Sequence, residues 1–331
     1  MKIYPQPKPN TMKIEPTEGC TLACWFCAIQ SIRENGASRD DQLNGQKSAP
    51  FKFMTKETMD RITLEVEKLD WAMRWEIAGR GEPTVNMNLE YLVQRIRERS
   101  PKSTIILTTN GSGLFRRLER IQKLFDAGLN ILALDDYKHA DFVAPIIQHF
   151  KDLEGVRDYE VMRYPEQPEA NIYRRVEPDL KRVVILRDIS LGGGVRNLTN
   201  QGGASGSAKA DLHEPCAKPF REITFRFDGH LALCCDDWPG IFKVPGNINT
   251  DSLLSLWHSK QMEAARRNLL RGERTFGPCQ GCDVRTKRNG LLPDKMGQDR
   301  GKMAMPDAES KAIIAKACAG PVLTPKIGGA S

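Results

Sequence analysis

Residues 20–27 read Cys-Thr-Leu-Ala-Cys-Trp-Phe-Cys and place Cys20, Cys24 and Cys27 in one short loop. Three thiolates can bind three irons of a [4Fe–4S] cluster and leave the fourth iron open to a substrate or cofactor. The alternative is zinc, but a structural zinc ion needs a closed set of four ligands. No fourth Cys or His lies within twenty residues of this loop, so the spacing favours an iron–sulfur cluster with one open iron.

The cysteine loop resembles the signature of the radical S-adenosylmethionine (SAM) superfamily, C-x3-C-x-aromatic-C, with Phe26 as the aromatic residue. The stretch Gly79-Arg80-Gly81-Glu82-Pro83 is similar to the family's GGEP element with one residue inserted. The stretch Thr108-Thr109-Asn110-Gly111 is similar to its TNG strand ending. The resemblance implies that SAM contacts Phe26, Gly79, Gly81, Glu82, Thr108 and Asn110. Arg187 and Arg196 are candidates for the SAM carboxylate, because a guanidinium can donate two hydrogen bonds to a carboxylate.

A second set of cysteines, Cys216, Cys234, Cys279 and Cys282, gathers late in the chain. Four thiolates close a coordination site, and their spacing alone does not distinguish zinc from [4Fe–4S]. The order C-x12-G-x4-C, a helix containing Trp257 and then CxxC is similar to the SPASM/twitch extension of radical SAM enzymes. Because only Cys318 follows the CxxC, the resemblance implies the shorter twitch form, with one auxiliary [4Fe–4S] cluster.

The resemblance implies an enzyme that cleaves SAM reductively to a 5′-deoxyadenosyl radical, which abstracts a hydrogen atom from the substrate. Its cofactors would be SAM, the SAM-binding [4Fe–4S] cluster and the auxiliary cluster, with an electron donor such as flavodoxin or ferredoxin. A fully ligated auxiliary cluster cannot activate SAM but can accept an electron, which favours oxidation, cross-linking or radical rearrangement over methylation. The sequence identifies no catalytic acid or base.

Short β-branched runs alternate with amphipathic helical stretches between residues 12 and 188. The predicted strands are residues 12–16, 75–78, 104–108, 129–134 and 182–186. The predicted helices are residues 55–69 with Thr55 as N-cap, 88–99, a segment ending at Gly128, and 251–271. Asp228-Gly229 predicts a two-residue hairpin turn between strands at 223–227 and 231–235. The alternation indicates an α/β fold with a parallel sheet, and the resemblance implies a partial (β/α)6 barrel followed by a small α+β cluster domain.

Composition shifts and the cysteine sets together predict the domain order. Residues 189–213 contain six Gly and three Ser with few large apolar residues, which is typical of a linker or an active-site loop. The expected segments are an N-terminal extension (1–11), the barrel (12–188), this linker (189–213), the auxiliary cluster domain (214–285) and a basic, largely irregular tail (286–331).

Several residues near the second cysteine set are expected to have ordinary structural roles. Successive strand residues face opposite sides, so Cys235 is expected to point away from the site of Cys234 and to pack as a small apolar side chain. Cys318 is expected to be a free thiol. Asp236 and Asp237 are expected to be solvated turn residues.

The composition, with 40% apolar and 27% charged residues, is that of a globular protein and excludes a collagen-like or disordered chain. No run approaches the ~20 consecutive apolar residues of a membrane helix, and the N-terminus lacks the apolar core of a signal peptide. Nine cysteines, seven of them at metal-ligand spacings, and the lack of a secretion signal predict a cytoplasmic protein without structural disulfides.

The substrate is left open between two classes. The first is a peptide or a small metabolite bearing amine or hydroxyl groups. The second is a modified, amino-acid-decorated thymidine or other base in DNA, with Arg285, Lys287, Arg288 and the tail contacting phosphates; residues 283–331 hold nine Lys/Arg against five Asp/Glu, within a net charge of +7. A non-enzymatic electron carrier needs only closed sites, whereas the first cysteine loop leaves one iron open.

Overall fold

The computed structural model describes residues 9–22, 24, 26–29, 51–136, 143–150, 159–163, 184–188, 199–205, 211–284 and 307–319. In the first half of the chain the strands are β1 (Thr11–Ile14), β2 (Thr17–Glu18), β3 (Lys52–Phe53), β4 (Arg74–Ile77), β5 (Thr104–Thr109), β6 (Ile131–Asp136), β7 (Tyr159–Arg163) and β8 (Val184–Asp188). The helices there are α3 (Lys56–Lys68), the 3₁₀ turn η1 (Pro83–Val85), α4 (Leu89–Arg99), α5 (Glu119–Asp126) and α6 (Val143–Phe150).

The second half contributes fewer and shorter elements. They are η4 (Gln201–Gly203), α7 (Lys218–Arg221), β9 (Glu222–Phe225), β10 (Leu231–Ala232), α8 (Leu253–Trp257), α9 (Lys260–Leu270), η5 (Gly277–Cys279) and α11 (Asp307–Ala317). In the part of the chain that the structure describes, no helix is both long enough and apolar enough to cross a membrane.

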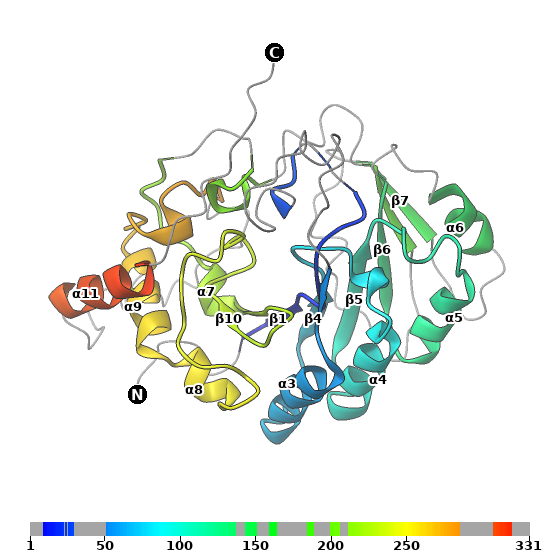
Figure 1. The fold of residues 1–331 in the computed structure, drawn as a ribbon, viewed down its shortest axis with the longest axis horizontal. Coiled ribbons are helices and arrows are strands. Elements are labelled where there is room, and N and C mark those ends of the chain that lie inside the picture. Colours follow the sequence, from blue (N-terminus) through cyan, green and yellow to red (C-terminus); the bar gives the residue numbers. More distant parts are fainter. Residues whose placement is uncertain are drawn as a thin grey trace, which may run out of the picture.

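The main sheet has the strand order β10-β9-β1-β4-β5-β6-β8-β7. Strands β1, β4, β5, β6, β8 and β7 are all parallel to their neighbours, with β8 between β6 and β7. The sheet curls, and α3, α4, α5 and α6 lie along its outer side (Figure 1). This is the predicted α/β partial barrel. The strand at 159–163 comes from a region whose sequence pattern is ambiguous, and it takes the edge position outside β8.

Local sequence signals explain the outer layer. Thr55 caps α3, because its hydroxyl accepts a hydrogen bond from the Thr58 amide. Gly128 follows α5 with φ of 109°, and a Cβ there would lie 2.6 Å from Cγ of Arg97. Only glycine fits this turn, so the predicted helix end is confirmed.

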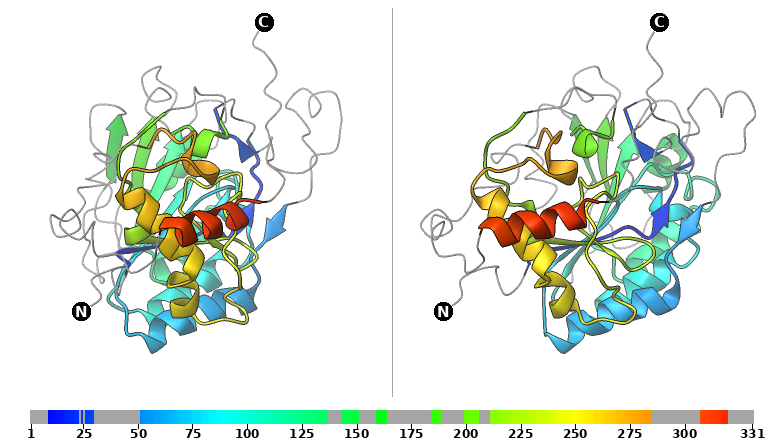
Figure 2. Two further views of the ribbon diagram at one scale, coloured as in Figure 1. Left: turned by 90° about the vertical axis from the view of Figure 1, so that its left-hand side faces the viewer. Right: turned by 60° about the vertical axis from the view of Figure 1, so that its left-hand side comes forward.

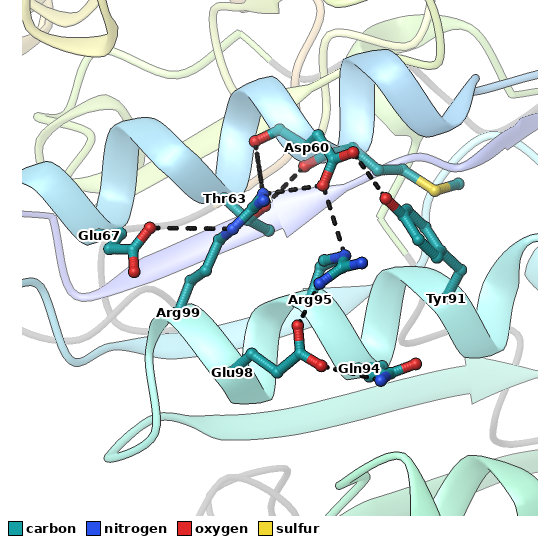
Figure 3. A network of polar contacts seen from close by, with 9 residues as sticks. Asp60, Thr63, Glu67, Tyr91, Gln94, Arg95, Glu98 and Arg99 are labelled. Atoms are coloured by element: carbon teal, nitrogen blue, oxygen red, sulfur yellow. Dashed lines mark hydrogen bonds and ion pairs between the residues drawn. The ribbon is translucent and has the colours of Figure 1, made fainter.

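Polar contacts join α3 to α4 over the buried apolar side chains between them (Figure 3). The carboxylate of Asp60 accepts hydrogen bonds from the Tyr91 hydroxyl at 2.6 Å and from Arg99 Nη1 at 2.8 Å. Arg99 Nη1 also donates to the Thr63 hydroxyl at 2.7 Å. The contacts are partly solvated, so they fix the register of the two helices while the apolar core supplies most of the stabilisation.

The C-terminal half continues the barrel sheet instead of forming a separate layer. Strand β9 pairs in parallel with β1, Met12 opposite Ile223, and β10 pairs with β9 in antiparallel fashion. The hairpin turn is wider than the two residues predicted, because the Arg226 amide donates to the His230 carbonyl at 3.0 Å. Gly229 has φ of 83°, as in three-residue hairpin loops.

One helical prediction needs correction. Residues 251–271 form two helices, because Ser259 takes an extended conformation and its hydroxyl caps a new helix at the Met262 amide. The tail, predicted to be largely irregular, contains α11 among its described residues, and this helix lies across α9 (Figure 2). The Ser310 hydroxyl bonds to the Ala264 carbonyl and Asn268, and Ile314 is buried. The tail residues outside 307–319 lie beyond the described residues.

Candidate functional site

Three loops meet where β1, β4 and β5 end. Gly19 and Gly81 form a parallel bridge: the Gly19 amide donates to the Arg80 carbonyl at 3.2 Å, and the Glu82 amide donates to the Gly19 carbonyl at 2.9 Å. The hydroxyls of Thr21 and Ser112 lie 2.6 Å apart. The cysteine loop, the GRGEP loop and the TTNG loop therefore form one structure at the carboxyl edge of the sheet, where parallel barrels carry their active sites.

The three cysteines of the first loop lie close enough to interact electrostatically. The Cys27 amide donates to the Cys24 carbonyl at 3.0 Å, which closes a turn. The Cys20 sulfur accepts hydrogen bonds from the Leu22 amide and from Nδ2 of Asn110, each at 3.4 Å. Burial, and then neighbouring Glu82, raise the pKa of the Cys20 thiol to about 12; burial raises that of Cys27 to about 12 as well. A metal cation deprotonates such thiols by direct coordination.

Glu82 holds the loops together from inside. Its carboxylate accepts hydrogen bonds from the Asn110 amide at 2.8 Å, from the Thr84 amide at 3.0 Å, and from the Thr84 and Thr109 hydroxyls. It is 2% exposed, and burial raises its pKa. The predicted SAM contact Glu82 therefore joins the end of β4 to the end of β5 through protein groups.

The residue inserted in the GRGEP loop has a defined place. Arg80 is 5% exposed and forms ion pairs with Glu15 at 3.0 Å and Glu18 at 2.9 Å. Its Nη1 donates to the Trp238 carbonyl at 3.2 Å. Arg80 thus connects the GRGEP loop, the segment that leads into the cysteine loop, and the C-terminal half. Sequence reasoning noted the insertion but missed this role.

The second cysteine set converges on one pocket. Cys216, Cys234, Cys279 and Cys282 all line it, together with Lys218, Asp236 and Arg274. Burial raises the pKa of all four thiols. These residues come from a loop, a hairpin, and a CxxC turn far apart in the sequence, and the tertiary structure brings them together.

Arg274 closes this pocket. Its guanidinium donates to the carbonyls of Glu214 at 2.8 Å, Val284 at 2.8 Å and Pro215 at 3.2 Å. These bonds join the segment before Cys216 to the segment after Cys282. The positive charge of Arg274 also lowers the pKa of both cysteines against the larger effect of burial, so it stabilises their thiolates.

The residues after Cys234 differ from expectation. Asp236 and Asp237 are buried, with 5% and 1% exposure, and are not solvated turn residues. Cys235 is not packed as an apolar side chain, because Nζ of Lys218 lies 2.8 Å from its sulfur. Lys218 also pairs with Asp236 at 2.6 Å. Burial lowers the pKa of Lys218, but Asp236 and Cys235 outweigh it and raise the value well above normal.

This charged group continues onto the inner face of the sheet. Lys13 in β1 pairs with Glu76 in β4 at 3.4 Å. The neighbouring residues Met12 and Trp75 belong to the apolar core, together with residues of the helices on the outer side of the sheet. Burial lowers the pKa of Lys13, but electrostatic interactions with Cys235, Glu76 and Glu222 outweigh it and raise the value above normal. The inner face of the barrel beside the auxiliary pocket is therefore polar and charged.

The remaining predicted SAM contacts are only partly placed. Thr108 lies in β5 beside Ala133 and is partly buried, and Phe26 lies in the cysteine loop, also partly buried. The backbone of Arg187 lies in β8 beside Asp135. Arg196 lies outside the described residues. Cys318 is partly buried beside Gly277, whose added Cβ would lie 3.1 Å from its sulfur.

Residues 14–139 match the family model of the radical SAM superfamily, and residues 216–283 match that of the SPASM iron–sulfur cluster-binding domain. This chain is a radical SAM enzyme. The S-adenosyl-L-methionine-dependent 2-deoxy-scyllo-inosamine dehydrogenase of Niallia circulans is 23% identical over 279 residues, which is 83% of this chain and 92% of that protein.

Two solved structures share the fold of this radical SAM enzyme. The crystal structure of BtrN in complex with AdoMet and 2-DOIA has a TM-score of 0.59 at 20% identity, covering 84% of this chain and 94% of that one. Selenomethionine BtrN in an open conformation has a TM-score of 0.54 at 18% identity over the same shares of the two chains.

The cofactors of this radical SAM enzyme are SAM and [4Fe–4S] clusters, and its side chains fit them. Cysteine thiolate is the donor that iron–sulfur clusters use, and four cysteines line the auxiliary pocket, three of them buried and Cys279 partly buried. Among the residues that the structure describes, no three His, Cys, Asp or Glu side chains are grouped to hold a single metal ion.

Proposed function

We propose that this radical SAM enzyme oxidises a small metabolite that carries hydroxyl or amine groups. The observation that carries the proposal is the position of the four-cysteine pocket. Lys218 and Asp236 line that pocket and belong to the charged group that continues through Cys235 towards Lys13 on the inner face of the barrel. An electron-accepting site beside a polar interior suits a two-electron oxidation of a polar substrate.

In this proposal Cys20, Cys24 and Cys27 hold the SAM-binding cluster, and Cys216, Cys234, Cys279 and Cys282 hold the auxiliary one. When bound, these groups supply reductive cleavage of SAM to a hydrogen-abstracting radical and a one-electron acceptor. Asn110 donates a hydrogen bond to the Cys20 sulfur and Glu82 fixes the Asn110 backbone, so both orient the first site. Gly79, Gly81 and Thr108 line the same strand ends and are proposed SAM contacts, with Phe26, Arg187 and Arg196.

The relative from Niallia circulans supports a dehydrogenation, since its name describes the oxidation of an aminocyclitol by a SAM-dependent enzyme. The match extends over most of both chains. We propose accordingly a small-molecule substrate, a cytoplasmic location, and a flavodoxin or ferredoxin as electron donor. The cytoplasmic location is proposed because two cysteine sets have the spacings of metal ligands, which suit a reducing compartment.

The DNA alternative rests on Arg285, Lys287, Arg288 and other tail cations that lie outside the described residues. No contact in the described structure favours it. Among the residues that the structure describes, we likewise assign no groove to a peptide substrate. We therefore propose the metabolite class alone.

The test is anaerobic incubation of the reconstituted enzyme with SAM, dithionite and candidate substrates deuterated at carbons that bear hydroxyl or amino groups. Mass spectrometry should find deuterium in 5′-deoxyadenosine and a product that lacks one deuterium and one hydrogen of the substrate. Transfer of deuterium only from peptides or from nucleotides in DNA would contradict the proposed substrate class.

Matched cysteine variants provide the control. Cys24→Ala should abolish release of 5′-deoxyadenosine. Cys234→Ala should retain release and lose the oxidised product. Cys318→Ala, in a partly buried cysteine outside both sites, should retain both. Loss of 5′-deoxyadenosine in all three variants would show that the assay reports general damage and not the proposed sites.

A further inference from the structure

Residues 199–203, named the strap here, contact both cysteine-bearing regions and belong to the stretch predicted to be a linker or an active-site loop. At the auxiliary site Asn200 is fully buried and pairs with the CxxC turn. Its Nδ2 donates to the Gly281 carbonyl at 2.6 Å, its Oδ1 accepts from the Asp283 amide at 3.2 Å, and its own amide donates to the Asp283 carboxylate at 2.9 Å. The strap is therefore fixed to the segment that carries Cys282.

Two further contacts hold the strap against the hairpin that carries Cys234. The Thr199 hydroxyl donates to the Asp236 carboxylate at 2.9 Å. Gly202 has φ of 67°, and a Cβ there would lie 2.4 Å from the Asp236 carbonyl oxygen. The close approach of the two backbones leaves no room for a larger residue at position 202.

On its other side the strap reaches the first cysteine loop through Gln201. Oε1 of Gln201 accepts a hydrogen bond from the Ala28 amide at 2.8 Å, which places the side-chain amide one residue from Cys27. Hydrogen bonding by Gln201 also lowers the pKa of the Cys27 thiol against the larger effect of burial, and the amide nitrogen is the only donor of this side chain. Gln201 also has φ of 54°, a backbone conformation that residues other than glycine rarely adopt.

Strain of this kind persists only where surrounding contacts impose it, and it concentrates at functional sites. Here the contacts of Asn200 and Gly202 hold the backbone on both sides of Gln201, and the Gln201 side chain reaches the Ala28 amide beside Cys27. Hydrogen bonds to ligand sulfurs are one of the protein's means of setting the reduction potential of an iron–sulfur cluster. They stabilise the more negative, reduced state.

We propose that Gln201 is a positioning residue for the SAM-binding cluster, and that the strap makes the potential of that cluster depend on the auxiliary site. The proposal rests on the assignment of Cys20, Cys24 and Cys27 as cluster ligands. Gln201 raises the reduction potential by its hydrogen bond to Cys27, and Asn200 sets the geometry of that bond from the CxxC turn.

The first test replaces Gln201. Gln201→Met keeps the length of the side chain without its donor, and Gln201→Glu keeps the acceptor for Ala28 but offers no N–H to the sulfur. In an EPR-monitored redox titration of the SAM-binding cluster, each variant should have a ratio of oxidised to reduced cluster about tenfold higher at a given potential. For one electron this corresponds to a reduction potential lower by about 59 mV. Gln94→Met, on the exposed face of α4, is the matched control and should leave the potential unchanged.

The second test asks whether the auxiliary site takes part. Asn200→Ala removes both side-chain bonds to the CxxC turn but touches nothing in the first cysteine loop. It should shift the potential in the same direction as Gln201→Met, and the double variant should shift it no further than the larger single effect. Additive shifts, or no shift in Asn200→Ala, would overturn the dependence on the auxiliary site.

The outcomes separate this inference from the proposed function. If the unmodified protein shows no EPR signal that depends on Cys20, Cys24 and Cys27, the cluster assignment itself fails. If that signal is present and both Gln201 variants keep its potential and line shape, the role of Gln201 is refuted. A Gln201 variant that keeps the auxiliary irons and loses those of the first site supports the role, because it shows that the side chain holds Cys27 in place.

Discussion

Replacement of Arg80 should destabilise the protein far more than replacement of an ordinary surface arginine. The guanidinium is 5% exposed and pairs with Glu15, which is 3% exposed, and with Glu18. In Arg80→Leu, Glu18 retains its pair with Lys52 at 3.1 Å, but Glu15 has lost the cation that compensates its burial. Removal of one partner of a buried ion pair costs ~3–5 kcal/mol.

Urea denaturation of the reconstituted protein, followed by tryptophan fluorescence, measures the effect. We expect Arg80→Leu to lower the free energy of unfolding by ~3–5 kcal/mol, and Arg80→Leu/Glu15→Leu to recover much of that loss, because the second substitution removes the unpaired buried charge. The control is Arg95→Leu. Arg95 pairs with Glu98, the two side chains are 32% and 41% exposed, and exposed pairs contribute only ~0–1 kcal/mol. Equal costs for Arg80→Leu and Arg95→Leu, or a double variant less stable than Arg80→Leu, would refute the reasoning.

The other predictions concern metal content, the tail and pH. Reconstituted protein should contain about eight irons per chain and the alanine variant of the first three cysteines about four, whereas one zinc with four irons would contradict the auxiliary cluster. Arg274→Leu should lose about four irons but still release 5′-deoxyadenosine, since it disconnects only the segments around the second site; iron analysis and mass spectrometry check this. Deletion of residues 320–331 should leave the thermal midpoint nearly unchanged, but deletion of residues 307–331 should lower it, because α11 covers buried side chains of α9. Burial raises the pKa of Asp237 from 3.8 to about 6, so its contribution to stability is present below pH 3.8 and is lost as pH rises to 6; Asp237→Asn should flatten the unfolding free energy over that interval.

The chemistry of this protein was largely predictable from sequence because its ligands come as short local spacings. Cys20, Cys24 and Cys27 lie in one loop, and a CxxC turn needs only two residues between its ligands. The parallel sheet was predictable for a similar reason. Strand and helix periods are local, and a parallel strand pair requires a crossover, so repeated β-α units fix the fold class.

The tertiary structure alone decided which distant residues share an environment. Nothing local in the sequence indicated that Arg80 would meet the Trp238 carbonyl, or that Cys235 would face Lys218, because these pairs depend on β9 adding to β1 in one register. The strap lies in residues 189–213, which were predicted to be a linker or an active-site loop because six glycines and three serines bury little apolar surface. Its order comes from hydrogen bonds to both cysteine loops, and such bonds exist only after the chain has brought two sites, distant in sequence, to either side of it.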